Sequence, residues 1–357
     1  MPTVNINSPR YTRVFAQQQS GGFNAFNNSL GTWTSTGAAM IRVDEGAFSG
    51  QRNQPYTRLP YLTGTFSEQP GIRGRKSATL DMRGLAVIPS GTAGTAPDMD
   101  PILQNIFGAA STGTGSNTYA FTDTGFLPFS VFAFQHGIST LTSRAFWGCY
   151  VKTATFHFNQ AFISCDLSMD AGYMIDNVNF ANFDSIAKAG LTAFPTEPAS
   201  PTVNGQPITG FGTGYTCTVT TTAVGGSGAQ SLELKIRDMT VTLDTGKQLV
   251  GDLYGSPYPV EAVGGSRRCA IQFTCLDDDS AALNAIKSQA DQDNITMTVS
   301  IVAGTVAGSI ITVTLNAVQA SAFNLVDSGN IVNMSLSESY AHATAIGNTD
   351  DLTLKFS

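Results

Sequence analysis

Three histidines are the residues best suited to acid–base or metal chemistry, and the chain spreads them widely. His136 precedes a glycine at the end of an alternating strand pattern, His157 lies within TATFHFNQ, and His342 follows another strand pattern. Metal centres and nucleophilic triads need several such groups to converge. The spacing therefore favours structural roles, and we expect no enzyme, no metal and no cofactor.

The cysteines also favour packing over chemistry. Their number is odd, and no two have the C-x-x-C spacing of metal or redox motifs. Cys269 and Cys275 share one face of an alternating strand with Ile271 and Phe273, which is typical of small core residues rather than of ligands. The full set is Cys149, Cys165, Cys217, Cys269 and Cys275. Reduced thiols, no leader-like start and no apolar run long enough for a bilayer predict a protein made in the cytoplasm, without a membrane anchor.

Two other motifs resemble ligand-binding sequences only superficially. Asp277, Asp278 and Asp279 are adjacent, whereas a cation loop alternates its oxygen ligands around a glycine, so they favour helix capping. GFGTG at 210–214 lacks both the strand-to-helix setting and the lysine of a phosphate loop. Neither motif predicts a site.

Composition points to a β-rich chain that does not grip nucleic acid. Of the 357 residues 42% are hydrophobic, only 13% are charged, and 36 are glycine, which permits real cores joined by many turns. The net charge is −7, and no basic stripe is present to neutralise phosphates.

A strand, a Gly/Pro loop and a short helix follow one another between Ser77 and Gly108. The alternation of SATLDMRG predicts a half-buried strand, and APDMDPILQNIFG predicts a helix that begins near Pro97 and ends before Gly108. The same order recurs in SRRCAIQFTCLDDDSAALNAIKSQADQ, at 266–292. Strand patterns before and after both copies also correspond, so we infer an internal duplication; chance matching of generic β patterns is the alternative.

These patterns divide the chain into five parts. We expect an N-terminal arm (1–36), a first domain (37–178), a Pro/Gly-rich linker (179–229), a second domain (230–345) and a C-terminal strand (346–357) whose apolar residues alternate. Two basic clusters occupy equivalent points of the two copies, and an acidic surface of a neighbouring subunit is a simpler partner for them than phosphate. They comprise Arg73, Arg75, Lys76, Arg267 and Arg268.

The run KSATLDMRGLAV…GTAGTAPDMDPILQNIFG resembles the segment that joins a sheet strand to a small helix in tail tube proteins of long-tailed bacteriophages. Ala96, Pro97 and Leu103 stand where that family has a similar stretch. The second half resembles the family from 295 to 340 and in the closing NTDDLTLKFS, although Asn316-Ala317 replaces a usual proline. The resemblance covers most of 38–357 and depends on the order of diffuse motifs.

The resemblance implies a mainly β fold with short helices, in which duplicated β-sandwich or barrel domains contribute strands to an oligomeric β-barrel. Such a virion protein self-assembles into stacked rings, the tail tube, through which DNA passes into the host. Two domains per chain favour a trimeric, pseudo-hexameric ring over a hexamer, with each helix over an outer domain face. Implied partners are further copies and the terminator, distal tail and tape measure proteins; the implied location is the virion tail, assembled in the bacterial cytoplasm.

Polar rows in the long hairpins are candidates for lining the tube. Their acidic members would repel phosphate within the screening length of about 8 Å; ordinary solvent exposure explains them equally well. The candidates are Ser164, Asp166, Ser168, Asp170, Asn333, Ser335 and Ser337.

Two other classes of protein compete with the tube. A capsid decoration or receptor-binding β-sandwich would use aromatic loops such as 21–33, which can equally be an arm that reaches the adjacent ring. A hydrolase would need clustered histidines and carboxylates, which the sequence does not show.

Overall fold

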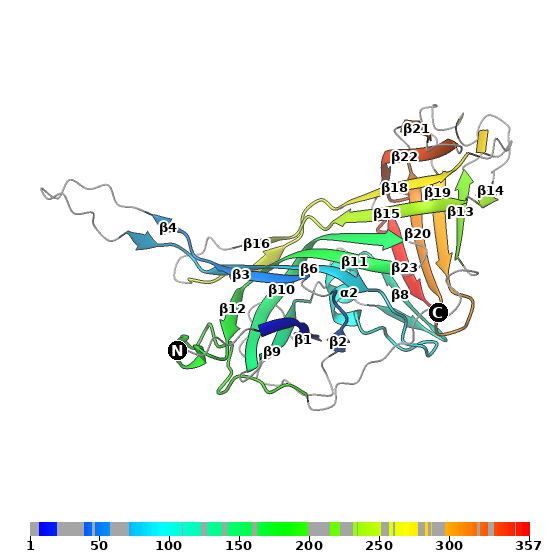
Figure 1. The fold of residues 1–357 in the computed structure, drawn as a ribbon. Helices are drawn as coiled ribbons and strands as arrows, with labels where there is room; N and C mark the ends of the chain where they lie inside the picture. Colours follow the sequence, from blue (N-terminus) through cyan, green and yellow to red (C-terminus); the bar gives the residue numbers. More distant parts are fainter. Residues whose placement is uncertain are drawn as a thin grey trace, which may run out of the picture.

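The computed structural model describes most of the chain. It covers residues 7–19, 39–44, 47–57, 71–108, 110–122, 127–137, 141–158, 163–198, 215–221, 231–233, 235–250, 257–259, 261–277, 283–284, 287, 297–319, 322–327, 332–346 and 348–357. These residues confirm a mainly β fold with little helix, and none of their sheets closes into a barrel (Figure 1). We call 7–198 the first half and 215–357 the second half.

Eight antiparallel strands form what we call the central sheet, which crosses the molecule in Figure 1. Every pair of neighbours in it is antiparallel, so its two outermost strands run in opposite directions. In spatial order the strands are β3 (Phe48–Asn53), β6 (Ser77–Ala86), β11 (Ile163–Ala171), β10 (Leu141–Phe158), β15 (Ile236–Asp244), β18 (Arg268–Leu276), β22 (Val332–Ala341) and β21 (Ala322–Asp327).

A flanking sheet packs on each half of the central sheet. Strand β10 is 18 residues long and belongs to two sheets, because its first part pairs with β9 and β12 and its last part with β11 and β15. The first flanking sheet is β2 (Ala39–Ile41), β1 (Asn7–Gln18), β9 (Phe129–Gly137), β10 and β12 (Tyr173–Asp176). The second is β14 (Ser231–Glu233), β13 (Tyr215–Thr221), β19 (Met297–Ala303), β20 (Ile311–Val318), β23 (Leu352–Phe356), β8 (Ser116–Ala120) and β7 (Ser111–Gly113).

The two halves pair their strands in the same order. β2-β1-β9-β10-β12 in the first half corresponds to β14-β13-β19-β20-β23 in the second, and β3-β6-β11-β10 corresponds to β15-β18-β22-β21. Two strands of the second half thus correspond to the long β10: β20 to its first part and β21 to its last part. Each half also inserts a small hairpin at the same point, β4 (Tyr56–Thr57) with β5 (Ile72–Arg73), and β16 (Gln248–Val250) with β17 (Glu261–Val263).

The expected helix of the first half is confirmed as α2, Asp100–Phe107. Pro101 lies in the first turn, where its missing N–H costs no hydrogen bond because the first N–H groups of a helix have no partner within it. Gly108 ends the helix with a φ of 106°, a conformation that favours glycine. Its side chains are nearly all buried in the larger core, where the helix contacts β1, β9 and β10 and also β8 of the second flanking sheet, rather than covering an outer face as expected. In the second half, Leu283, Asn284 and Lys287 are helical.

Two apolar cores hold the layers together. The larger one runs through both halves, between the central sheet and the two flanking sheets. The smaller, aromatic one lies on the other face of the first flanking sheet, beneath residues 180–198, where Trp147 Nε1 donates to the Ala187 carbonyl over 2.9 Å. Glu197 fastens this segment by an ion pair with Arg13 at 2.9 Å, and its Oε2 also lies 2.7 Å from His136 Nε2.

The structure differs from the expected domain limits in two places. Residues 7–18, expected in an arm, form β1 between β2 and β9. The expected linker contributes the cover of the aromatic core and strand β13, which pairs with β19. The C-terminal strand, β23, is confirmed and pairs with β20 and β8.

Candidate functional site

One face of the central sheet is polar across both halves. Alternation within each strand sends apolar side chains into the larger core and small polar side chains to the opposite face. The strand registers place these polar residues opposite one another from β3 to β21. They include Ser49, Gln51, Thr79, Asp81, Thr153, Thr155, Thr240, Thr242, Gln272, Thr274 and Asn324.

The residues expected to line a tube fall on this face with unequal exposure. Asp166, Ser168, Asp170 and Ser335 are partly exposed. Ser164 and Asn333 are buried at the strand ends, and Asn333 accepts a hydrogen bond from Arg237 at 3.2 Å. The backbone of Ser337 pairs with Ala322.

Two aspartates of this face each have a polar side chain close by. The Lys152 ammonium lies 3.5 Å from Asp170 Oδ2, and His157 Nε2 lies 3.4 Å from Asp166 Oδ2. The Gly84 N–H also donates to Asp166 Oδ1 over 2.8 Å. Because such partly exposed pairs contribute little stability, their main consequence is a hydroxyl-rich face with less negative character than the aspartates alone predict.

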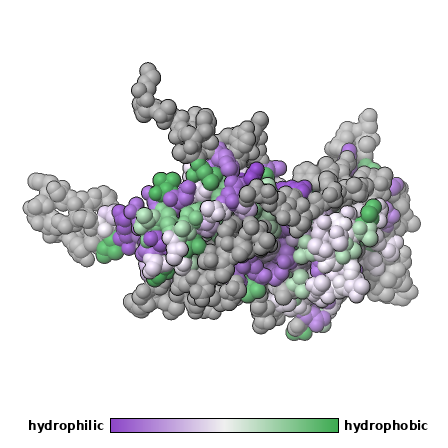
Figure 2. Space-filling model, turned by 90° about the horizontal axis from the view of Figure 1, so that it is seen from below, coloured by the Kyte–Doolittle hydropathy of each residue, from purple (hydrophilic) through white to green (hydrophobic). Residues whose placement is uncertain are grey.

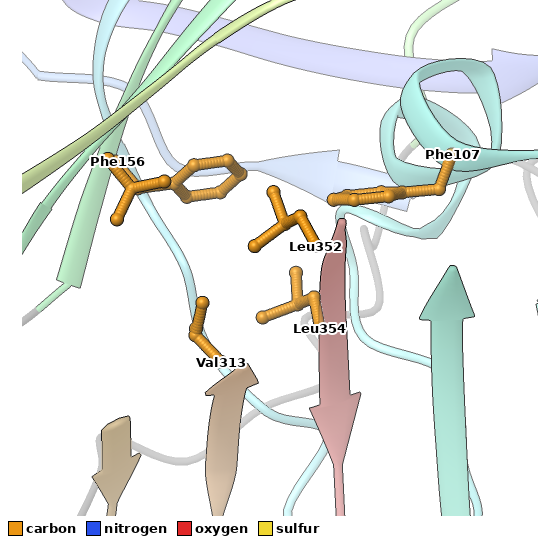
Figure 3. A pocket seen from close by; sticks show the side chains of 6 residues that line it. Phe107, Phe156, Val313, Leu352 and Leu354 are labelled. Carbon is orange, nitrogen blue, oxygen red and sulfur yellow. The ribbon is translucent and has the colours of Figure 1, made fainter. Parts of the chain in front are cut away.

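The central sheet is continuous because β10 of the first half pairs directly with β15 of the second. Six residue pairs form this junction, from Thr153 with Asp244 to Phe158 with Met239. On the core side it leaves a cavity of only about 10 Å³, lined by Phe107, Phe156, Val241, Val313, Leu352 and Leu354 (Figure 3). This apolar space has at most the volume of a single water molecule and no polar lining to hold one, so the two halves are closely packed.

A hairpin of the first half crosses into the second flanking sheet. β8 pairs with β23 from Asn117 with Phe356 to Ala120 with Thr353. Tyr119 packs edge-on against Phe356 at 5.8 Å, and its hydroxyl donates to Asp100 Oδ1 over 2.6 Å. Burial, and then the charge of Asp100, raise the pKa of Tyr119 well above its ordinary value.

Lys247 joins the second half to helix α2 of the first. It follows β15 after a turn at Gly246, whose φ is 64°, and its side chain is buried. The ammonium donates to the carbonyl oxygens of Asn105 and, over 3.4 Å, Ile106 in the last turn of α2. Such carbonyls lack donors within the helix and favour a cation, whereas burial lowers the pKa of Lys247 to about 7.

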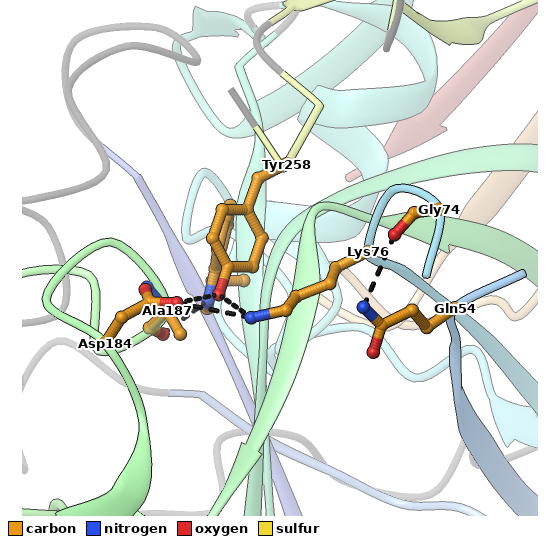
Figure 4. A network of polar contacts seen from close by, with 7 residues as sticks. Gln54, Gly74, Lys76, Asp184, Ala187 and Tyr258 are labelled. Atoms are coloured by element: carbon orange, nitrogen blue, oxygen red, sulfur yellow. Dashed lines mark hydrogen bonds and ion pairs between the residues drawn. The ribbon is translucent and has the colours of Figure 1, made fainter. Parts of the chain in front are cut away.

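Tyr258 is a second link between the halves (Figure 4). Its ring is buried in the aromatic core, 5.9 Å from Trp147 and 5.1 Å from Tyr173. Its hydroxyl donates to Asp184 Oδ2 over 2.6 Å and accepts from Lys76 Nζ over 3.0 Å. Partial burial would raise the pKa of Asp184, but hydrogen bonds from Tyr258, the Ala187 N–H and Lys76 together lower it.

The basic clusters mostly have partners within the chain. Lys76 serves the Tyr258 link, and beside it a cavity of about 280 Å³ is lined partly by Arg75. Arg267 lies 3.4 Å from Asp351 and stacks on Phe121. Arg268 lies 3.9 Å above the ring of Tyr340, and Arg73 is exposed on β5. The structure therefore brings Lys76, Arg267 and Arg268 into internal contacts.

Strands β3 and β21 are the two edges of the central sheet. Each pairs on one side only among the described residues. β21 carries Leu325, whose side chain is 68% exposed. On β3, a Cβ at Gly50 would overlap the ring of Phe146, which packs edge-on against Phe48 at 5.9 Å.

The described residues contain no group of three or more histidines, cysteines or acidic residues placed to hold a metal ion. All five thiols are buried, and burial raises the pKa of Cys217 and of Cys269 to about 12, which leaves both as unreactive thiols. None of the described helical segments has the length and apolar character needed to cross a membrane.

Sequence reasoning missed Lys247 and Tyr258 as links. A lone lysine after a strand, or a tyrosine between two prolines, gives no periodic signal in the sequence. The Thr-Gly-Lys turn after β15 was the available hint, since a glycine at positive φ can direct the next side chain inward.

No family model matches the chain, and no curated protein matches its sequence.

Proposed function

We propose that this chain is a structural protein that assembles head to tail into rings, which stack into a tube like those of long-tailed bacteriophages. The observation that carries the proposal is the β10–β15 junction. Within one chain, β15, the first central strand of the second half, already pairs with β10, the last central strand of the first half. The two halves are, in this proposal, duplicated tube domains.

The sheet edges support repeated addition. β21 occupies in the second half the place of the last part of β10, and β3 occupies in the first half the place of β15. β3 and β21 run in opposite directions, so a second copy can repeat the antiparallel junction. Such head-to-tail contacts form a ring when the rotation closes, and closure removes the exposed edges.

The number of halves favours three chains. A sixfold arrangement of equivalent halves needs three copies, each contributing eight central strands. Because closed sheets of roughly 16 to 18 strands already enclose an aqueous channel, the resulting barrel would be hollow.

The polar face of the central sheet then lines the channel. This face consists mainly of threonine and serine hydroxyls and has no continuous row of lysine or arginine among the described residues. Because lysine and arginine provide most of the affinity for phosphate, duplex DNA would move through the channel without being bound tightly. Among the described residues that are coloured in Figure 2, hydrophobic side chains are scattered rather than gathered into one large patch. This distribution favours assembly through strand edges over assembly through a broad apolar surface.

As a tail tube protein the chain would reside in the virion tail after assembly in the bacterial cytoplasm. Its partners would be further copies and the terminator, distal tail and tape measure proteins. DNA would be a passing cargo, and no catalytic step is assigned to the chain.

Electron microscopy of the purified protein, with its mass in solution, tests the proposal. Rings or hollow tubes with three chains per ring are expected. Six chains per ring would retain the tube and overturn the pseudo-sixfold argument. Discrete monomers at high concentration would overturn the tube and favour a capsid decoration or receptor-binding module.

A further inference from the structure

Leu325 is an exposed apolar side chain on a strand whose equivalent is buried. β10–β11 ends at Phe158 with Ile163, and β21–β22 ends at Asp327 with Val332. Four residues separate the two strands in the sequence in both cases, so counting back from the strand ends places Leu325 at the position of Phe156. Phe156 is 4% exposed in the junction core, whereas Leu325 is 68% exposed.

Gly50 is equivalent in position to Val241, the residue opposite Phe156 at the junction of the two halves. Asn53 with Ser77 ends the β3–β6 ladder, and Asp244 with Arg268 ends the β15–β18 ladder. Counting back three residues from Asn53 and Asp244 makes Gly50 equivalent to Val241, which lies opposite Phe156 within the chain.

The surroundings of Gly50 form a site for an apolar side chain. The Phe146 ring fills the space that a Cβ at Gly50 would need, and Phe48 packs edge-on against that ring. Phe146 is fully buried whereas Phe48 is only partly buried, so Phe48 is the member of the pair that reaches the open edge of β3. At this edge the ring of Phe146 occupies the space equivalent to the one that the Val241 side chain fills at the β10–β15 junction.

We infer that β21 of one copy pairs with β3 of the next in one register, with Leu325 opposite Gly50 and its side chain against Phe48, the partly exposed partner of the buried Phe146 ring. The inference rests on the proposed head-to-tail assembly and adds its register and its apolar contact. On the polar face, the same register places Asn324 opposite Gln51, as Thr155 lies opposite Thr242 within the chain.

Replacing Leu325 tests the apolar contact. Leu325→Ser should fold normally, because a substitution at an exposed position changes stability little, but it should need at least tenfold more protein to form rings. Ile346→Ser is the matched control, since Ile346 is also exposed and lies off the edge. Leu325→Met should retain assembly. Equal assembly of Leu325→Ser and the wild-type protein would overturn the inference.

Cross-linking tests the register. A chain carrying Gln51→Cys and Asn324→Cys should, on mild oxidation of assembled protein, give covalent dimers and closed trimers. The offset pair of Asn53→Cys and Asn324→Cys should give far less, because diagonal neighbours lie about 7–8 Å apart and a disulfide needs Cβ atoms near 3.8 Å. The native thiols are buried and add little background.

The outcomes separate the register from the assembly. If wild-type rings form but the offset pair cross-links better, the register is wrong and the proposed function stands. If wild-type protein forms no ring at any concentration, both fall.

Discussion

The ammonium of Lys247, in the second half, donates a hydrogen bond to the carbonyl oxygen of Asn105, near the end of α2 in the first half. A buried lysine of the second half thus donates hydrogen bonds to the last carbonyl groups of a helix in the first half. The carbonyl groups favour the charged ammonium, whereas burial favours the neutral amine. The stability of the junction should therefore depend on pH.

Stability should rise with pH above neutrality because of Lys247. Its pKa is about 7 in the folded chain and about 10.4 in an unfolded one. Between these values the unfolded chain binds more protons, so raising the pH stabilises the fold, by about 2 kcal/mol between pH 7 and 9. Urea unfolding at both pH values measures the effect.

Lys247→Met is the control that isolates this lysine, since other groups titrate identically in both proteins. The variant should lose the additional rise. Parallel pH profiles for the two proteins would show that Lys247 titrates normally.

The Tyr258 link should stabilise the association of the two halves through its ring more than through its hydroxyl. Tyr258→Ala empties a space in the aromatic core and should cost about 3–5 kcal/mol. Tyr258→Phe loses the bond to Asp184, a residue that water can reach, and should cost about 1 kcal/mol. Denaturant unfolding compares the two, and equal losses would place the contribution in the hydroxyl.

The junction core should be sensitive to loss of volume. Leu354 is buried beside a cavity of only about 10 Å³, so Leu354→Ala should lower the free energy of unfolding by about 2–5 kcal/mol. Ile346→Ala, at an exposed site, should change it by less than about 0.5 kcal/mol. A small effect at Leu354 would mean that the core collapses around the deletion.

The polar face should become inaccessible to large reagents on assembly. Thr242→Cys should react with a polymer-linked maleimide rapidly in the isolated chain and slowly in tubes, whereas a small maleimide reaches it in both. Thr353→Cys, on the far face of the second flanking sheet, is the comparison and should react with both in tubes. Rapid polymer labelling of Thr242→Cys in tubes would place the polar face outside.

Much of the fold follows from local patterns. The alternation at 77–86 predicted β6, Pro and Gly signals bracketed α2, and alternating Leu352, Leu354 and Phe356 predicted β23. These predictions succeed because side-chain periodicity and turn chemistry act over a few residues. The same patterns indicated the polar rows.

The chain order of the elements, by itself, suggested that the two halves correspond, and it predicted a mainly β protein without clustered catalytic groups. Only the tertiary structure decided that β1 lies inside a sheet, that α2 is buried between sheets, and that β10 pairs with β15. The tertiary structure also decided the buried contacts of Lys247 and Tyr258 and the exposure of Leu325. Burial, pKa and edge position depend on strands far apart in sequence, and no local pattern encodes which strand becomes the neighbour.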